Sequence, residues 1–210
     1  KRTFHPPVSK WFASADALLQ PRFVHNERPH NDYEKEVLLP HSLSHEGPAI
    51  AAGDLNGDGI KDLWIGGGAG QGGVLYLALP NGAYAGIQPK VASVDAAYED
   101  QAGVWFDYDG DGDDDLYVGS GSHELGEGSP LLRDRMYRND GGELNWDDEA
   151  LPDLRINTSF VVPLDVDGDG DLDLFIGARS VPGKYPLKPS SALLRNDKGK
   201  FTVVTNMHPA

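Results

Sequence analysis

One acidic loop occurs three times in this chain, and each copy leads directly into an apolar run. The copies are GDLNGDGIKDLWIGG (53–67), FDYDGDGDDDLYVGS (106–120) and LDVDGDGDLDLFIGA (164–178). Counted from Asp54, Asp107 and Asp165, each has an acidic or Asn residue at positions 1, 3 and 5, glycine at position 6 and aspartate at position 9. Like charges at this spacing repel one another and oppose folding. A chain that repeats them beside strand-forming residues therefore needs a neutralising partner.

The similarity between the copies extends beyond the acidic loop. A strand-like run precedes each copy (49–51, 104–106 and 160–162), and the apolar run that follows is a second strand. Further along, YLALPNGAY, MYRNDGGEL and LLRNDKGKF place apolar residues around an Asn-containing turn, which is typical of a β-hairpin. Each unit thus predicts about four strands, and the first aspartates are 53 and 58 residues apart. Four-stranded units at this period indicate propeller blades, with a β-sandwich of unrelated hairpins as the alternative.

The acidic loop has the composition of a calcium site. Side chains at positions 1, 3 and 5 lie on one side of a tightly curled loop, and glycine at position 6 permits the sharp turn. The carbonyl of position 7 and the aspartate at position 9 complete a shell of oxygen atoms, which suits Ca²⁺ better than Zn²⁺ or Mg²⁺. The predicted ligands are Asp54, Asn56, Asp58, Ile60 and Asp62 in the first loop, Asp107, Asp109, Asp111, Asp113 and Asp115 in the second, and Asp165, Asp167, Asp169, Asp171 and Asp173 in the third, with Ile60, Asp113 and Asp171 contributing carbonyls.

Two other interpretations of these loops fit less well. An EF-hand needs a glutamate at position 12 and flanking helices, whereas position 12 here is Ile65, Val118 and Ile176, already within a strand. A plain acidic surface turn is the alternative for any single copy, and the first loop is the weakest in charge because Asn56 replaces an aspartate. Three Ca²⁺ ions would bring the formal net charge from −15 to −9. In the second loop we expect Asp114, which is outside the ligand set, to face solvent.

The overall composition excludes several classes of partner. A formal net charge of −15 disfavours nucleic acids and anionic membrane surfaces, since both bind basic faces. The absence of cysteine removes disulfides, thiolate metal ligands and cysteine nucleophiles. No run of about 18 apolar residues is present, so we expect no membrane span. The sequence starts at Lys1 with no apolar signal core, which we interpret as processing or trimming.

Several residues outside the loops are candidates for binding or catalysis. A Zn²⁺ site needs three or four converging ligands, so we favour surface or packing roles for His25, His30, His41 and His45. No catalytic pairing is visible among the free acids, such as Glu124, Glu127 and Asp134. The two longest insertions, ELGEGSPLLRDR and RSVPGKYPLKP, carry residues suited to lining a ligand or partner surface: Arg135, Arg179, Lys184 and Tyr185.

The repeat resembles the FG-GAP/VCBS repeat, the calcium-loop blade of integrin α-chain propellers and of many bacterial secreted proteins. The match covers about residues 48–205, and three sub-motifs are similar to the bacterial group: LLPHSLSHEGPAIAAGDLNGDG, DRMYRNDGG and LFIGARSVPGKYPLKPSSALLRND. The resemblance implies a β-propeller with Ca²⁺ in loops on one face, and structural, adhesive or carbohydrate-related roles. We therefore expect an all-β fold, a β-propeller or partial propeller of four-stranded blades. We expect it outside the cytoplasm, secreted, periplasmic or on the surface of a bacterial cell.

The expected organisation is one propeller domain. A leading segment (1–47) includes Phe23–His25 as a candidate outer strand of a preceding blade, and repeat units follow at 48–103, 104–158 and 159–210. We interpret the chain as part of a larger propeller; a short fourth blade built by the leading segment, or association of copies, is the alternative. The expected function is binding or adhesion to a protein or glycan, with no catalytic residues and no nucleic acid partner. A polysaccharide-degrading enzyme, a lyase or hydrolase on a propeller frame, is the alternative.

Overall fold

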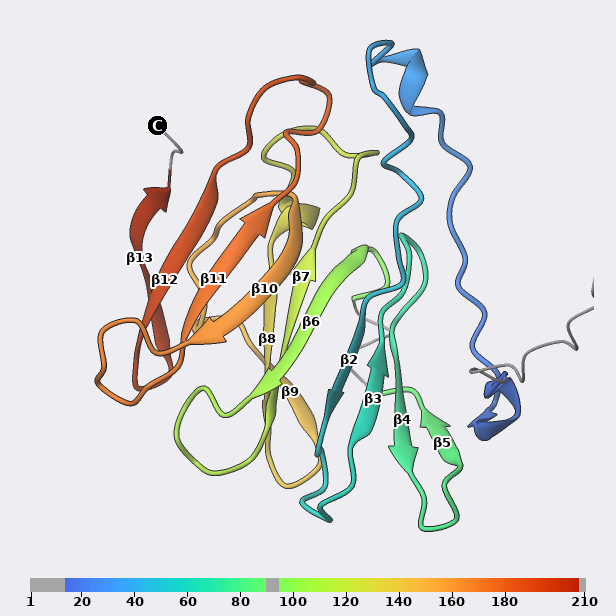
Figure 1. The fold of residues 1–210 in the computed structure, drawn as a ribbon, viewed down its shortest axis with the longest axis vertical. Helices are drawn as coiled ribbons and strands as arrows, with labels where there is room; N and C mark the ends of the chain where they lie inside the picture. The colour runs from blue at the N-terminus through green and yellow to red at the C-terminus, as the bar shows by residue number, and fades with distance from the viewer. Residues whose placement is uncertain (1–13, 90–94, 208–210) are drawn as a thin grey trace, which may run out of the picture.

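The computed structural model describes residues 14–89 and 95–207, and this part of the chain forms three β-sheets in a row (Figure 1). The first sheet contains β2 (Ile50–Gly53), β3 (Asp62–Ile65), β4 (Val74–Ala78) and β5 (Tyr84–Ile87). The second contains β6 (Asp100–Phe106), β7 (Asp115–Ser120), β8 (Arg135–Asn139) and β9 (Leu144–Asp147). The third contains β10 (Thr158–Leu164), β11 (Asp173–Ala178), β12 (Ser191–Asp197) and β13 (Lys200–Met207).

Each sheet is one four-stranded antiparallel blade, as the repeat predicts. Consecutive strands are neighbours throughout, and a short strand β1 (Leu19–Gln20) adds to the edge of the first blade by pairing with β5 in parallel. The remaining elements are the 3₁₀ turns η1 (Asp16–Leu18), η2 (Asp32–Glu34) and η3 (Pro130–Leu132), and the described residues form no α-helix. The expected all-β fold of a partial propeller is confirmed.

The strand register places each acidic loop in the same position. In every unit the aspartate at position 9 pairs with the residue just before the loop: Asp62 with Gly53, Asp115 with Phe106, and Asp173 with Leu164. The acidic loop is therefore the tight connection between the first and second strands of its blade. All three loops lie at the same edge of the row, which is the lower edge in Figure 1.

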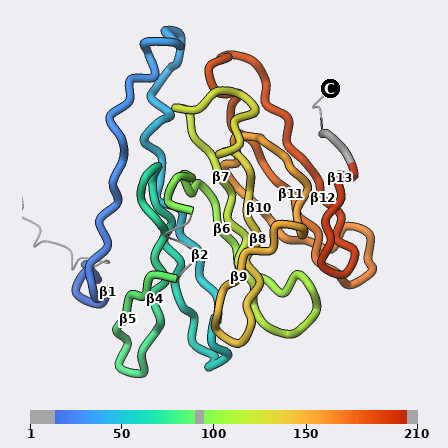
Figure 2. Tube along the Cα trace, turned by 180° about the vertical axis from the view of Figure 1, so that it is seen from behind, coloured from blue at the N-terminus to red at the C-terminus, as the bar shows by residue number. Residues whose placement is uncertain are grey.

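Apolar side chains fill the two spaces between neighbouring blades. The layer between the first and second blades is built around Trp64, Trp105 and Leu116. The layer between the second and third blades includes Tyr117 and Leu174. The first strands β2, β6 and β10 lie next to one another, as in a propeller whose blades are arranged around an axis (Figure 2).

Burial along the strands follows from how many faces of a blade are covered. Every residue of β7 in the middle blade is buried, since both faces of that blade are covered. In β10 of the third blade, exposed and partly buried residues alternate after the buried Thr158. That alternation has a period of two, which indicates that one face of the third blade is covered and the other is not.

The leading segment does not form a blade of its own in the described residues. Phe23–His25, the candidate outer strand, is in no strand. Instead, Tyr76 Oη donates to the Pro21 carbonyl at 2.7 Å, and Gln71 Nε2 donates to the Val24 carbonyl at 2.8 Å, which ties the segment to the first blade. Residues 1–13 of this predicted segment and residues 90–94 of the first unit lie outside the described part of the chain.

Candidate functional site

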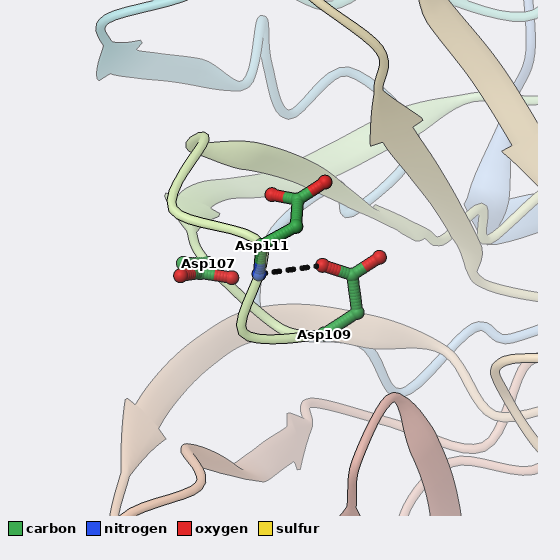
Figure 3. A group of neighbouring side chains, drawn as sticks. All are labelled: Asp107, Asp109 and Asp111. Carbon is green, nitrogen blue, oxygen red and sulfur yellow. Dashed lines mark hydrogen bonds between the residues drawn. The ribbon is translucent and has the colours of Figure 1, made fainter.

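The second acidic loop gathers three carboxylates between β6 and β7 (Figure 3). One oxygen atom from each of Asp107, Asp109 and Asp111 lies within 4.8 Å of the other two. The backbone curls around Asp107, whose Oδ1 accepts from Gly110 N at 2.7 Å and whose Oδ2 accepts from Gly112 N at 3.0 Å. Asp109 Oδ1 accepts from Asp111 N at 3.2 Å, the dashed line in Figure 3. Positions 1, 3 and 5 therefore converge as the spacing predicts.

The third loop has the same curl but gathers a different set. One oxygen atom from each of Asp165, Asp167 and Asp173, at positions 1, 3 and 9, lies within 4.8 Å of the other two. Asp165 accepts from Gly168 N at 2.7 Å and from Gly170 N at 3.2 Å, which matches the hydrogen bonds of Asp107 in the second loop. The two loops together bring positions 1, 3, 5 and 9 into the candidate site.

The first loop has a similar curl, in which position 1 accepts from position 5 instead of position 4, and it has a weaker donor set. Asp54 accepts from Asp58 N at 3.2 Å and from Gly59 N at 2.8 Å. Asn56 Nδ2 donates to Asp58 Oδ2 at 3.1 Å, so an amide occupies the place where the other loops have a third carboxylate. Within the described residues, only the second and third loops bring three acidic groups this close together. This agrees with the lower charge expected for the first loop.

The aspartates at position 9 are part of the blades and not of the exposed loops. Asp62, Asp115 and Asp173 are at most 1% exposed. One oxygen of each accepts the N–H of loop position 2, and the other accepts an N–H from the third strand. The donors are Leu55 and Ala78 for Asp62 (3.1 and 2.7 Å), Tyr108 and Asn139 for Asp115 (3.1 and 2.8 Å), and Val166 and Asn196 for Asp173 (2.9 and 2.7 Å). The aspartate at position 9 thus joins the loop to the sheet, with or without a bound metal ion.

Two glycines in each loop permit the curl. At position 6, as predicted, Gly59, Gly112 and Gly170 have φ of 82°, 97° and 98°. Position 4 requires the same positive φ: the values at Gly57, Gly110 and Gly168 are 70°, 81° and 79°. Sequence reasoning missed position 4, although glycine stands there in all three copies. Residues with a Cβ resist this left-handed conformation, so both positions select glycine.

The loop carboxyls are not fully compensated by protein groups. Burial, followed by repulsion from Asp111, raises the pKa of Asp109. Burial raises the pKa of Asp115 to about 7, and repulsion from Asp109 and Asp111 adds to the rise. In the third loop, desolvation and then repulsion from Asp169 raise the pKa of Asp167. A cation among these groups would favour their ionised forms and remove the repulsion.

The donor set fits a hard divalent cation. The two converging groups consist of carboxylate oxygens alone, without histidine. Ca²⁺ prefers oxygen ligands and accepts irregular shells, whereas Zn²⁺ prefers histidine or thiolate ligands. Bound there, the cation would neutralise the loop and hold the turn between the first and second strands. The second and third loops can therefore hold a metal ion.

Two residues differ from expectation, one in the second loop and one at the opposite edge of the second blade. Asp114 does not simply face solvent: its Oδ2 accepts from Asp54 N at 3.2 Å and lies 3.1 Å from Lys61 Nζ, which joins the second loop to the first. Arg135, expected to line a ligand surface, is 2% exposed and forms an ion pair with Asp100. The reason is that Arg135 opens β8, where its charge is balanced inside the blade and does not reach an outer loop.

The other candidate residues make local contacts. His25 pairs with Glu27, His30 Nε2 lies 3.6 Å from Asp32 Oδ1, and His45 Nδ1 lies 3.0 Å from Ser44 Oγ. No histidine belongs to a converging metal group in the described residues. Asp134 is buried and accepts from Tyr117 Oη, Ser120 N and Thr158 Oγ1. Of the candidates in the two long insertions, Lys184 pairs with Glu127 and Arg179 pairs with Glu46.

A second group of acids lies near the start of β6, at the edge opposite the acidic loops. Glu99 is 2% exposed, and its Oε1 accepts from Gln101 Nε2 at 2.7 Å. Burial raises the pKa of Glu99 to about 7, and repulsion from Glu27 and Glu124 adds to the rise. Within the described residues, Glu99 Oε2, Glu27 Oε2 and Glu124 Oε1 are buried without a hydrogen-bond partner. This acid cluster opposes folding when it is ionised.

Replacing Glu99 by glutamine is expected to stabilise the protein at pH 8 and to have little effect near pH 5. The folded-state pKa of about 7 exceeds the ordinary value of 4.5, so the contribution of Glu99 to stability is present below pH 4.5 and is lost as the pH rises through 7. At pH 8, E99Q should raise the free energy of unfolding by up to about 3 kcal/mol, measured by urea unfolding. The exposed control Glu34→Gln should change little at either pH. A loss of stability for E99Q at pH 8 would refute this assignment.

Three consecutive blades, each with a curled acidic loop between its first two strands, define a protein built from β-blade repeats whose loops resemble metal-binding loops. The family of FG-GAP-like repeats matches residues 54–118 and 107–176, which together cover more than half of the chain. This protein therefore belongs to the FG-GAP-like repeat family, and the expected resemblance is confirmed. A comparison with curated proteins finds no match. In the described residues, no helix is long and apolar enough to cross a membrane.

Proposed function

We propose that the three acidic loops bind Ca²⁺ and that the bound ions stabilise the blades. The observation that carries this proposal is the convergence of three carboxylates within 4.8 Å in two loops that share one backbone curl. Positions 1, 3, 5 and 9 would supply side-chain oxygens and position 7 a carbonyl. The proposed ligands remain Asp54, Asn56, Asp58, Ile60 and Asp62; Asp107, Asp109, Asp111, Asp113 and Asp115; and Asp165, Asp167, Asp169, Asp171 and Asp173.

We further propose that the protein is a binding module that acts outside the cytoplasm, where Ca²⁺ reaches millimolar levels that fill even weak sites. FG-GAP-like blades of a secreted bacterial type would suit adhesion to a protein or glycan. In this proposal, the units at 48–103, 104–158 and 159–210 form the frame, and calcium has a structural role. The binding surface then lies elsewhere, on loops that the frame holds in place.

A hollow of about 330 Å³ between the loops of the second and third blades is the proposed binding surface. It lies at the edge opposite the acidic loops, since the β11–β12 connection (179–190) forms much of its wall. Its lining combines apolar side chains with charged and polar ones: Val181, Leu187, Arg155, Lys188, Asn157 and Ser190. Such a mixture suits a sugar, which offers apolar ring faces and hydroxyl groups together.

Charge favours an acidic sugar or peptide side chain in this hollow. Arg155 and Lys188 contribute cations to the lining, and the lining carboxylate of Glu127 is paired with Lys184, in a chain whose formal net charge is −15. Arg155 is held in place by Asp153, which accepts from its Nε and Nη2 atoms at 3.1 and 2.7 Å. A held guanidinium and a nearby ammonium would attract a carboxylate. We therefore favour a uronate-containing glycan as the ligand.

A glycan array that includes polyuronides, probed in millimolar Ca²⁺, tests the binding role. The expected result is retention of acidic glycans that Lys188→Glu reduces at least about tenfold, because one like charge opposes binding. Lys200→Glu makes the same charge change on β13, outside this hollow, and should leave retention unchanged. Release of unsaturated or reducing sugar during incubation would instead support a lyase or hydrolase. Retention that Lys188→Glu leaves intact would refute the proposed surface.

A further inference from the structure

A serine, a histidine and a glutamate contact one another in sequence at the edge opposite the acidic loops, the upper edge in Figure 1. Ser180 Oγ lies 3.3 Å from His123 Nδ1, and His123 Nε2 is paired with a carboxylate oxygen of Glu36. They come from the β11–β12 connection (179–190), the β7–β8 connection (121–134) and the leading segment, and are 9%, 5% and 8% exposed. The order is that of a nucleophile, a general base and an acid that orients the base.

The surrounding hydrogen bonds fix the direction of this relay. Glu36 Oε1 accepts from Tyr185 N at 2.7 Å, and its Oε2 faces His123 Nε2. Because a carboxylate only accepts, we assign the proton of His123 to Nε2, which leaves Nδ1 as an acceptor. Asn157 Nδ2 donates to Ser180 Oγ at 3.0 Å, so the hydroxyl hydrogen of Ser180 is left to donate to Nδ1. The ring nitrogens serve in the reverse of the usual order, and either one can take a proton.

The hydroxyl of this relay is at a surface that a ligand can reach. Ser180 and Asn157 line the hollow of about 330 Å³ between the loops of the second and third blades. His123 and Ser180 together line a small adjoining cavity. Val181 also lines the hollow, and within the described residues its N–H donates no hydrogen bond. A free N–H on the residue after a nucleophile is suited to stabilise the oxyanion of a tetrahedral intermediate.

We propose that Ser180 is the nucleophile of an esterase site, with His123 as the general base and Glu36 as the residue that positions its ring. Ser180 Oγ bonds to the carbonyl carbon of an ester while its proton passes to His123 Nδ1. The bond from that carbon to the alcohol oxygen breaks, and the alcohol leaves with this proton. Water then attacks the acyl group and gives a proton to His123, which returns it to Ser180 as the carboxylic acid leaves.

The hollow indicates which ester would fit. Its lining mixes apolar side chains with the cations of Arg155 and Lys188, which suits an acidic sugar whose hydroxyl carries the acyl group. This choice of alcohol rests on the proposed glycan surface, whereas the ester chemistry does not. No catalytic residue was expected from the sequence, because the three residues of the relay are far apart in the chain.

A fluorophosphonate probe, which bonds covalently to activated serines, tests the nucleophile. We expect one label per chain on the peptide that contains Ser180, located by mass spectrometry, and a rate at least about a hundredfold lower in His123→Gln. Ser159→Ala is the matched control: Ser159 Oγ donates to the Gly177 carbonyl at 3.4 Å, and this variant should take the label as the parent does. A folded parent chain with no label on Ser180 would overturn the proposal.

Glu36→Gln separates positioning of the ring from a purely structural role. Glutamine still accepts from Tyr185 N, but its amide donates toward His123 Nε2 and places the ring proton on Nδ1, which can then no longer accept from Ser180. We expect kcat for p-nitrophenyl acetate to fall at least about a hundredfold, with little change in KM or in the thermal midpoint. A lower midpoint with unchanged kcat would show that Glu36 serves stability alone.

A thiol variant reports on the relay without any substrate, because the chain contains no cysteine. The thiol of Ser180→Cys should react with iodoacetamide at pH 6 at least about tenfold faster than that of Ser159→Cys, since His123 favours the thiolate below its ordinary pKa of about 8.5. Adding His123→Gln should remove the difference. A thiol of Ser180→Cys that is no faster than the control would overturn the relay.

An O-acetylated polyuronide tests the choice of alcohol. We expect release of acetate that Ser180→Ala abolishes. Labelling of Ser180 without acetate release would support the ester chemistry and refute the acylated acidic sugar as the substrate. A glycan array that retains no acidic glycan, together with a labelled Ser180, would refute the glycan surface and leave the esterase site in place.

Discussion

Replacing Asp115 by alanine is expected to lower the free energy of unfolding by about 3–5 kcal/mol even when calcium has been removed by a chelator. Asp115 accepts from Tyr108 N at 3.1 Å and from Asn139 N at 2.8 Å, and it is fully buried between β7 and β8. Alanine would leave both N–H groups buried without an acceptor and would leave a cavity beside them. Urea unfolding in chelator, followed by circular dichroism, measures the loss.

Asp111→Ala is the matched control in the same loop. Asp111 is exposed, and among the residues that the structure describes its carboxylate accepts only from Asp113 N, at 3.0 Å. In chelator this variant should change the free energy of unfolding by no more than about 0.5 kcal/mol. In saturating Ca²⁺ it should lose about 2–3 kcal/mol relative to the parent protein, because one site is damaged. Equal losses for the two variants in chelator would contradict a calcium-independent structural role of Asp115 in addition to its proposed role as a ligand.

The second large effect is expected for Asn139→Ala, which should cost about 3 kcal/mol. The side chain of Asn139 donates to the Leu55 carbonyl at 2.8 Å and to the Asp114 carbonyl at 3.1 Å, and it accepts from Gly142 N at 2.8 Å. One buried amide thus joins the loops of two blades and its own hairpin turn. Removing it leaves three backbone groups unsatisfied, and thermal or urea unfolding would report the loss.

Asn145→Ala provides the comparison for this variant. Asn145 lies on β9, is exposed, and donates to Asp140 Oδ2 at 2.9 Å. Its replacement should change the free energy of unfolding by no more than about 0.5 kcal/mol, because water satisfies the groups that it leaves. If Asn139→Ala changed the free energy of unfolding as little as Asn145→Ala, the hydrogen bond from Asn139 to the Leu55 carbonyl of the first blade would contribute little to holding the blades together.

The repeat made most of the fold predictable from the sequence. Three copies in register specify the strands before and after each loop, and the Asn-containing turns specify the two outer strands, so four-stranded blades follow from local patterns alone. The curl of the loops was predictable for the same reason, since alternating oxygens and a glycine at position 6 admit few conformations. Local signals of this kind repeat with the unit and support one another.

The features that sequence reasoning missed depend on contacts between units. Asp114 is the same residue type as its neighbours, and only the packing of two loops reveals its contacts with Asp54 and Lys61. Arg135 looks like a surface residue in the sequence because the buried acids that balance it lie 35 or more positions away, Asp100 nearest among them. The hydrogen bonds that Asn139 and Asn196 donate between blades could not be predicted either, since their acceptors, the carbonyls of Leu55 and Tyr108, lie in the preceding blade.

The leading segment shows the limit of local resemblance. RFVHN is similar to the outer strand KFTVVTN, yet residues 23–25 form no strand, and the neighbouring Leu19–Gln20 pairs with β5. A short run of apolar residues specifies a strand only where an edge is available to pair with it. Here the edge of β5 pairs with Leu19–Gln20, a few residues before the segment that the similarity indicates.

A thermal melt with and without calcium tests the central claim most directly. Millimolar Ca²⁺ should raise the unfolding midpoint by about 5–10 °C over the value in chelator, since each ion binds the folded loops and not the unfolded chain. A variant with Asp54, Asp107 and Asp165 all changed to alanine should melt at the same temperature in both conditions, and Mg²⁺ should substitute poorly for Ca²⁺. A midpoint of the parent protein that does not move between Ca²⁺ and chelator would contradict the calcium-stabilised blade.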